Sequence, residues 1–301
     1  MPLLGFLSIS QPTVLSSSMS PQTADISVVT VVLNDKSGLE GAISSVQRQR
    51  SLAIEHLIVD GGSIDGSAEL ARKFSSVLID SKPDGGIYPA MQRGAARATG
   101  EFLIFCNSGD MLFGEDFLAN AIRQLRNEKS LWGFGPIIEL TQRDTYAWVS
   151  APSYADSKSI ISRKVFVPFP SFIIDRNLFL QLGGLTDQFK IAGDFELICK
   201  TANTSNPSIF RDPVALFTAG GISYVSADLA WKEEIAIRIK LFDLSFLDRC
   251  KQWFKFLIRL ARWKTGKILD LIQTHSPFRI SSWREYRTNP VPTEYAKFLT
   301  E

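Results

Sequence analysis

Three loops that are rich in acidic residues and glycine follow three successive apolar segments of the 301-residue sequence. Asp60 opens DGGSIDGS, Asp84 lies in SKPDGGIY, and Asp110 ends NSGD. Carboxylates accept hydrogen bonds from polar ligands, and glycine lets the backbone approach a ligand closely. The pattern therefore indicates a polar ligand site assembled from several loops.

Each of these loops also has a purely structural interpretation. A short Asp-Gly run is often a turn that leads into a helix N-cap, and Ser63 and Asp65 have the residue types of a cap. Asp65 fits the cap, which leaves Asp60 for a ligand. The recurrence of such loops after three strands in a row favours the ligand site.

Strands alternate with helices around these loops. ISVVTVVL (26–33) is a continuous β-branched run, typical of a strand buried on both faces of a parallel sheet. An open α/β sheet binds ligands outside the carboxyl ends of its strands, where the three loops begin. Further strands are expected at 55–60, 77–80 and 101–106, with helices near 38–49, 65–74 and 86–98, so the fold class is α/β with a mostly parallel sheet.

After residue 114 the alternation becomes irregular. We expect a helix near 115–127, a hairpin in 131–149, an apolar strand in 166–175, helices near 176–182 and 193–203, short strands near 208–211 and 214–218, and helices over 231–273. The main domain is expected to span residues 25–225. Residues 1–24, rich in Ser, Pro, Thr and Gln, are expected to form a disordered leader.

Bulk composition excludes several classes of function. A net charge of +2 does not suggest nucleic acid as a partner. Three widely spaced cysteines without a C-x-x-C pair indicate reduced thiols in a cytosolic protein. The two histidines share no cluster with Cys, Ser or Asp, which argues against a zinc site and Ser-His-Asp chemistry. No run of about 18 apolar residues indicates a spanning helix.

Four blocks of the sequence resemble the family 2 glycosyltransferases, most closely the bacterial enzymes that build cell-surface polysaccharide. The blocks are VVTVVLN (28–34), VDGGSIDGS (59–67), the segment from SKPDGG to NSGD (81–110) and LGGLTDQFKIAGDFEL (182–197). The resemblance covers roughly residues 26–225. It implies a GT-A fold, a Rossmann-like nucleotide-diphospho-sugar transferase domain. It also implies transfer of a sugar, with inversion, from a nucleoside diphosphate donor with the help of Mg²⁺ or Mn²⁺.

The resemblance further implies roles for individual residues. A departing diphosphate gathers negative charge, which a divalent cation with oxygen ligands stabilises. The acceptor hydroxyl attacks the sugar from the opposite face and gives its proton to a carboxylate. By motif, Asn34 and Asp60 would hold the nucleoside, Asp84, Gly85 and Gly86 would close on the nucleotide, Asn107 and Asp110 would form the metal motif with Asp110 as the ligand, and Asp194 would be the catalytic base.

Departures from the family pattern leave alternatives open. NSGD has one carboxylate where many relatives have two or three acids, so a catalytically weak or inactive glycosyltransferase-like binding protein is one alternative. A sugar nucleotidyltransferase is another, although VLNDKSGLEGA (32–42) lacks the Gly-rich, Arg/Lys-containing loop expected of that class. Asp110 also fits a helix N-cap or turn acid, Asp194 also fits an N-cap, and Glu196 lies close to Asp194.

Residues 226–301 are expected to form a helical, basic C-terminal extension. Within 250–272, apolar and aromatic residues recur at helical spacing and Lys or Arg lies between them, which suits an anionic membrane surface. A helix packed on the main domain with a solvated basic face fits equally. We expect a cytoplasmic enzyme, peripheral at the inner face of the cell membrane. Its expected partners are a nucleotide-sugar donor, with a UDP-sugar expected, and a saccharide or lipid-linked acceptor.

Overall fold

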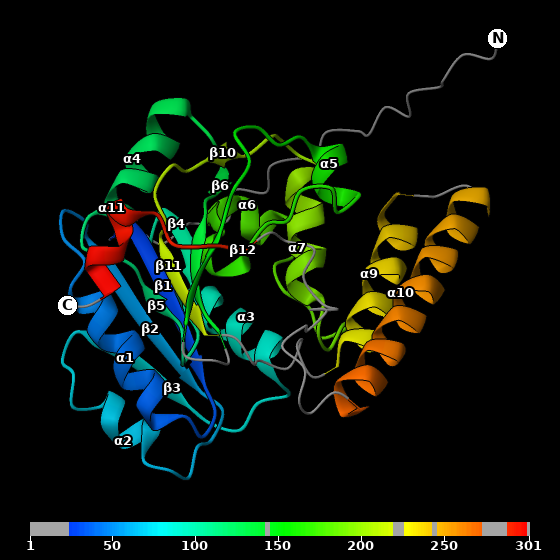
Figure 1. Cartoon of the computed structure of the whole chain (residues 1–301). Helices are drawn as coiled ribbons and strands as arrows, with labels where there is room; N and C mark the ends of the chain where they lie inside the picture. The colour runs from blue at the N-terminus through cyan, green and yellow to red at the C-terminus, as the bar shows by residue number, and fades with distance from the viewer. Residues whose placement is uncertain (1–23, 142–144, 219–225, 243–245, 273–287, 300–301) are drawn as a thin grey trace.

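The fold is built around two β-sheets (Figure 1). A computed structural model describes residues 24–141, 145–218, 226–242, 246–272 and 288–299. The first sheet has seven strands in the order β10-β6-β9-β4-β1-β2-β3. These strands are β1 (Ile26–Val32), β2 (Ile54–Asp60), β3 (Val77–Ser81), β4 (Phe102–Phe105), β6 (Trp132–Phe134), β9 (Ile173–Asp175) and β10 (Ser208–Ile209).

Strand β1 lies inside this sheet and is buried along its whole length. It pairs in parallel with β2 on one side and β4 on the other, while β9 runs antiparallel to β4. Val29 and Val31 pack against one layer of helices, and Ile26 and Val28 pack against the other. Because both faces are covered, the strand tolerates only apolar or internally bonded side chains. The predicted α/β fold with a mostly parallel sheet is confirmed.

Helices cover both faces of the seven-stranded sheet (Figure 1). One face is packed by α1 (Lys36–Gln47), α2 (Ser67–Ala71) and α4 (Phe117–Glu128). The other is packed by α3 (Ile87–Arg97), α6 (Arg176–Gln181) and α7 (Gly193–Ala202).

The second sheet has five strands in the order β12-β8-β7-β11-β5. They are β5 (Met111–Leu112), β7 (Ile137–Leu140), β8 (Tyr146–Val149), β11 (Ala215–Thr218) and β12 (Thr288–Asn289). Strand β5 directly follows the NSGD loop and pairs with β11, so the second sheet begins beside the predicted ligand site.

Two local predictions are wrong in their extent. The hairpin expected in 131–149 is confined to β7 and β8, because β6 joins the first sheet between β10 and β9. The strand expected in 166–175 shrinks to β9, which is preceded by a short α-helix α5 (Ser157–Ile161) and a 3₁₀ turn η1 (Phe169–Ser171). Pro168 and Pro170 lack the N–H that a strand ladder needs, so the apolar run is interrupted.

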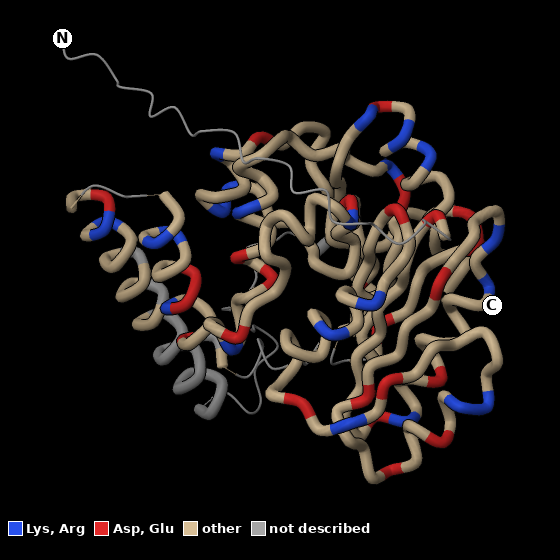
Figure 2. Tube along the Cα trace, turned by 180° about the vertical axis from the view of Figure 1, so that it is seen from behind, with Lys and Arg blue, Asp and Glu red and all other residues tan. Residues whose placement is uncertain are grey.

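The C-terminal part contains α9 (Ala227–Phe242), α10 (Phe246–Ile272), α11 (Thr293–Ala296) and the 3₁₀ turn η2 (Lys297–Leu299). Figures 1 and 2 both show α9 and α10 side by side on one flank, with α10 outermost. No helix in the described segments has both the length and the apolar content needed to cross a bilayer. The expected extension also contains a strand, because β12 returns to pair with β8. The leader expected over 1–24 lies outside the described residues except for its last position.

Candidate active site

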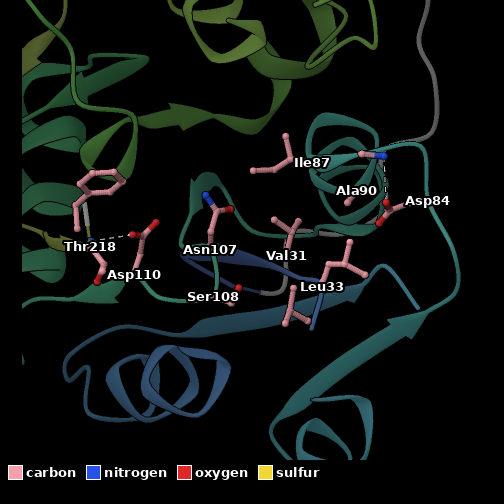
Figure 3. Close-up of a pocket in the computed structure, with 12 residues that line it drawn as sticks. Val31, Leu33, Asp84, Ile87, Ala90, Asn107, Ser108, Asp110 and Thr218 are labelled. Carbon is pink, nitrogen blue, oxygen red and sulfur yellow. Dashed lines mark hydrogen bonds between the residues drawn. The ribbon is translucent and has the colours of Figure 1, made fainter. Parts of the chain in front are cut away.

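A cavity of about 300 Å³ opens at the carboxyl ends of the central strands (Figure 3). Its walls come from four places: the end of β1, the NSGD loop after β4, the start of α3, and the end of β11. The lining residues are Val31, Val32, Leu33, Asp84, Gly86, Ile87, Ala90, Asn107, Ser108, Asp110, Phe217 and Thr218. Three of the sequence-predicted polar side chains, those of Asp84, Asn107 and Asp110, therefore share one cavity.

Backbone geometry holds the NSGD loop against β1. The N–H of Ser108 donates to the carbonyl of Val31 at 3.0 Å, which continues the strand pairing beyond β4. The N–H of Asp110 then donates to the carbonyl of Asn107 at 3.0 Å and closes a tight turn. Gly109 sits inside that turn with a φ of 86°, a conformation that favours glycine. The glycine is therefore required by the turn that presents Asn107 and Asp110.

Asp110 is a buried carboxyl group that faces the cavity, with 5% of its surface exposed. Its Oδ1 accepts a hydrogen bond from the N–H of Thr218 at 3.4 Å, a long contact (Figure 3). Burial raises the pKa of Asp110 to about 7, against hydrogen bonds from Thr218 and Asn107 that lower it. Because α4 begins only at Phe117, Asp110 is not its N-cap.

Asn107 points its side chain into the same space as Asp110 (Figure 3). Its Oδ1 is buried and has no hydrogen-bond partner in the described part of the chain. A buried carbonyl oxygen without a partner is costly unless a ligand satisfies it. Asn107 and Asp110 thus offer oxygen ligands of the kind that Mg²⁺ and Mn²⁺ accept, with further positions left for phosphates and water. No group of three or more His, Cys, Asp or Glu side chains suited to a metal occurs among the described residues.

Asp84 forms the opposite wall of the cavity at the start of α3. Its Oδ1 accepts a hydrogen bond from the N–H of Gly86 at 3.1 Å. Arg93 lies 4.0 Å from the other oxygen and pairs more closely with Asp80, at 3.3 Å. Gly86 also lines the cavity, whereas Gly85 is not among the lining residues. Arg93 also donates to the carbonyl of Asp60 at 3.3 Å. The loop predicted to close on a nucleotide therefore lies beside the cavity, and Arg93 links it to the ends of β2 and β3.

Asp60 and Asn34 do not line the cavity, and their side chains form hydrogen bonds within the surrounding loops. Asp60 accepts hydrogen bonds from the N–H of Ser63 at 3.1 Å and from the hydroxyl of Ser81 at 2.6 Å. Burial opposes its ionisation, but these bonds prevail and lower its pKa. Asn34 accepts a hydrogen bond from the N–H of Ile64 at 2.8 Å. The two residues shape the DGGSIDGS loop, and their role toward a nucleoside stays a prediction.

Asp194 lies in the first turn of α7. Its Oδ1 accepts hydrogen bonds from the N–H of Phe195 at 2.7 Å and from the hydroxyl of Tyr88 at 3.3 Å. Burial raises its pKa, and the guanidinium of Arg163 opposes that rise. The residue at the N-cap position is Ala192, so Asp194 is not the cap. Asp194 does not line the cavity.

Tyr88 connects Asp194 with the cavity, although the sequence did not single it out. It belongs to α3, whose first residues line the cavity, and its hydroxyl donates to the carbonyl of Ile191 at 2.5 Å. A Cβ at Gly193 would lie 2.8 Å from the Tyr88 ring, so only glycine permits this packing. The Asp-Gly-Gly-x-Tyr spacing was the available signal, because it places Tyr88 one residue after a lining position.

Phe217 and Thr218 also line the cavity. They end β11 and open FTAGGIS (217–223), of which residues 219–223 lie outside the described part. The hydroxyl of Thr218 donates to the carbonyl of Gly109 at 2.6 Å, which joins β11 to the NSGD loop.

Comparison with known sequences gives one family. Residues 27–191 match the model of glycosyl transferase family 2. An uncharacterized glycosyltransferase of Mycobacterium tuberculosis is 32% identical over 203 residues, which is 65% of this chain and 76% of the relative. A PGL/p-HBAD biosynthesis glycosyltransferase of Mycobacterium bovis is 24% identical over 250 residues, 79% of this chain and 94% of the relative.

Comparison with solved structures supports the fold. The crystal structure of S. aureus TarS 1–349 in complex with UDP-GlcNAc superposes with a TM-score of 0.60 and 16% identity, covering 77% of this chain and 71% of that one. The mannosyltransferase PcManGT from Pyrobaculum calidifontis, in complex with GDP-Man and Mn²⁺, gives a TM-score of 0.57 and 16% identity, covering 82% and 74%. The similarity extends over most of the chain and indicates a common architecture.

Proposed function

The chain belongs to glycosyl transferase family 2, and from this premise we propose that it transfers one sugar, with inversion, from a nucleoside diphosphate sugar to a saccharide or lipid-linked acceptor in the synthesis of cell-surface polysaccharide. As a member of this family it is a glycosyltransferase with the GT-A fold. The main support for the proposed site is the cavity at the ends of the central strands, which is lined both by Asp110 and by Asn107, whose buried Oδ1 has no hydrogen-bond partner in the described part of the chain.

The donor is proposed to lie in this cavity with its diphosphate toward Asn107 and Asp110. These two residues would hold Mg²⁺ or Mn²⁺, which when bound neutralises charge on the leaving diphosphate. TarS in complex with UDP-GlcNAc and PcManGT in complex with GDP-Man and Mn²⁺ are consistent with a donor of this class and with such an ion. We expect UDP as the nucleotide, with the nucleoside near Asn34 and Asp60 and the Asp84-Gly85-Gly86 loop closing over it.

Asp194 is proposed as the general base. Its carboxylate would accept the proton of the acceptor hydroxyl as that hydroxyl attacks the anomeric carbon. Burial raises its pKa above that of an ordinary aspartate, which makes it a stronger base once it is ionised. The hydroxyl of Tyr88, in the first turn of α3, lies 3.3 Å from this carboxylate and would help to orient it.

A screen of nucleotide sugars for transfer or hydrolysis in the presence of Mg²⁺ or Mn²⁺ tests the proposal. Asp110→Ala and Asp194→Asn should each reduce turnover by about 100-fold or more, the size expected for loss of a charge-stabilising or proton-accepting group. Asp116→Asn, an exposed acid six residues after Asp110, is the matched control and should retain parental turnover.

The outcomes also separate the alternatives. Full activity in both variants would mean that the site is misplaced. Binding of nucleotide sugar without any transfer would instead support a glycosyltransferase-like binding protein. Formation of nucleotide sugar from a sugar phosphate and a nucleoside triphosphate would support a nucleotidyltransferase.

We further propose that α10 contacts an anionic bilayer at the inner face of the cell membrane. Six apolar side chains on its first half are between 41 and 79% exposed: Phe246, Leu247, Trp253, Phe254, Leu257 and Ile258. Their spacing of three, four and seven residues places them along one side of the helix. Phe256 is buried, so the helix also has an inner side.

The charge of α10 favours an anionic bilayer as the surface that the helix contacts. Its sequence has seven basic residues (Arg249, Lys251, Lys255, Arg259, Arg262, Lys264 and Lys267) against two acids (Asp248 and Asp270). Basic residues beside an apolar stripe bind anionic headgroups while the apolar side chains enter the interface. An acceptor linked to lipid would then lie close to the enzyme.

Vesicle co-sedimentation tests this contact. The protein should bind vesicles containing phosphatidylglycerol, bind phosphatidylcholine vesicles much less, and lose binding in a Phe254→Ser/Leu257→Ser variant. Leu180→Ser, which changes an exposed leucine of α6, is the control and should bind normally. Equal binding of the parent and the double variant would refute the membrane contact. If the parent is a dimer and the double variant is a monomer, the apolar side of α10 contacts a second copy of the chain instead.

A further inference from the structure

Three consecutive backbone N–H groups just before α7 converge on one carboxylate from a distant helix. Oε1 of Glu233 accepts a hydrogen bond from the N–H of Lys190 at 2.9 Å. Oε2 accepts from Ile191 at 2.8 Å and from Ala192 at 2.9 Å. Glu233 belongs to α9 and lies more than 40 residues along the chain from this loop. The loop 190–192 leads directly into Gly193 and Asp194 at the start of α7.

The opposite side of the same loop is held by α3. The carbonyl of Ile191 accepts the Tyr88 hydroxyl, while its N–H donates to Glu233. The peptide groups before Asp194 are therefore fixed from both directions. The same hydroxyl lies 3.3 Å from Oδ1 of Asp194, the proposed base, and its single proton is shared between the two acceptors. The loop and the rim of the donor cavity therefore form one connected unit.

Helix α9 is itself anchored on α7. Ile237 is buried in an apolar cluster with Ala192, Phe195 and Cys199 of the α7 segment. Ile237 lies one helical turn after Glu233, so the anchoring contact and the carboxylate occupy the same side of α9. Arg163 and Arg238 pair with Glu234 on the neighbouring side of the helix and lie over the Phe195 ring. Glu233 thus extends from a fixed support.

We infer that Glu233 is a positioning residue that sets the placement of Asp194 for proton transfer. The inference rests on the proposed role of Asp194 as the base. A carboxylate with two acceptor oxygens satisfies three converging donors, whereas an amide has one acceptor oxygen and would turn an NH₂ group toward N–H donors. A displacement of about 1 Å in a reacting group can reduce turnover by about 100-fold, so the geometry of this loop bears directly on the rate.

Glu233→Gln tests the inference in the full-length protein. The turnover number, normalised to the molecules that bind UDP or GDP (whichever the parent binds), should fall by about 10- to 100-fold. The dissociation constant for that nucleotide should stay within about twofold, since the donor cavity is untouched. Asp228→Asn, a half-exposed acid on the same helix, is the matched control and should behave like the parent. Glu233→Asp, which keeps the charge on a shorter side chain, should recover part of the rate.

The readouts separate positioning from general support of the fold. Parental turnover per nucleotide-binding molecule in Glu233→Gln would overturn the inference. A parallel loss of turnover and nucleotide affinity would overturn it as well, because the effect would then reach the whole site. If Glu233→Gln does not give folded protein, Glu233→Asp is judged by the same two measurements. Asp194→Asn is measured alongside. If Asp194→Asn keeps its turnover, the proposed base is wrong. If Asp194→Asn loses turnover while Glu233→Gln keeps the parental value, only the role of Glu233 is refuted.

Discussion

Asp60 and Asp110 are both buried aspartates at the carboxyl edge of one sheet, yet their pKa values shift in opposite directions. Asp60 is enclosed by hydrogen bonds from Ser63 and Ser81 that stabilise its charge despite burial. Asp110 is buried with a long contact to Thr218 and an open cavity in front of it. At the scale of single residues, the hydrogen bonds of Asp60 favour folding of its charged form, whereas ionised Asp110 costs folding free energy. Such a cost is consistent with the proposed role of Asp110 in ligand binding.

Alanine variants of Asp60 and Asp110 should differ in their free energies of unfolding. Asp60→Ala should lower the free energy of unfolding by about 2 to 4 kcal/mol, because it removes a charged acceptor and leaves Ser63 and Ser81 unpaired. Asp110→Ala should change it by less than about 1 kcal/mol, because it removes a buried carboxyl group at an open cavity. Urea unfolding of the metal-free protein, followed by tryptophan fluorescence, gives both values. Equal losses would contradict the assignment of Asp110 to ligand binding.

The central strands also contain a buried pair of polar side chains that affects the stability of the sheet. His56 of β2 is buried, and its Nε2 lies 2.9 Å from the hydroxyl of Thr30 on β1. Burial lowers the pKa of His56 to about 4 from its ordinary value of 6.5. The imidazole is therefore neutral in the folded sheet and becomes protonated in the unfolded chain at mildly acidic pH.

This difference predicts a pH-dependent loss of stability. Between pH 6.5 and about 4 the unfolded chain binds a proton that the folded sheet excludes, so stability falls as the pH falls, by about 1.4 kcal/mol per pH unit. Asp110 acts with the opposite sign in the same range because its pKa is raised. The measure is therefore the difference between the parent and His56→Gln, which keeps a polar group near Thr30 but does not titrate. Unfolding curves at several pH values should diverge toward higher pH, with the parent gaining up to about 3 kcal/mol relative to the variant; parallel curves would contradict the prediction.

Elements formed by local patterns could be predicted, whereas those formed by distant pairing could not. The β-branched run of β1 and the alternation through β4 determine an α/β sheet, and they place Asp84, Asn107 and Asp110 at one edge. The apolar residues of β6 satisfy a hairpin as well as the first sheet, and only contact with β9 and β10 decides between them. Glu233 has the sequence pattern of an ordinary exposed helix acid, because its partners are backbone N–H groups that carry no side-chain signature.

At the scale of the whole molecule, the two sheets meet at the candidate active site, and the segment 288–299 packs against the second sheet. Thr218 bonds to both Gly109 and Asp110, so the second sheet supports the NSGD loop directly. On the far edge of that sheet, β12 pairs with β8, and the Tyr295 ring stacks on Trp148 with a centroid distance of 5.2 Å. The segment 288–299 therefore serves as a strap across the main domain.

Tyr295 is the residue through which the strap should act on the stability of the whole domain. Its ring contacts Phe117 of α4 as well as Trp148, and its hydroxyl donates to Asp212 at 2.9 Å. Tyr295→Ala should lower the free energy of unfolding by about 3 kcal/mol, and Tyr295→Phe, which removes only the hydrogen bond, by about 1 kcal/mol. Tyr146→Ala removes a more exposed ring from β8 and should cost less than Tyr295→Ala. Calorimetry should therefore rank the melting temperatures with Tyr295→Ala lowest, on the order of 6 °C below the parent. A melting temperature of Tyr295→Ala equal to that of Tyr146→Ala would mean that the strap is an appendage and that the main domain is stable without it.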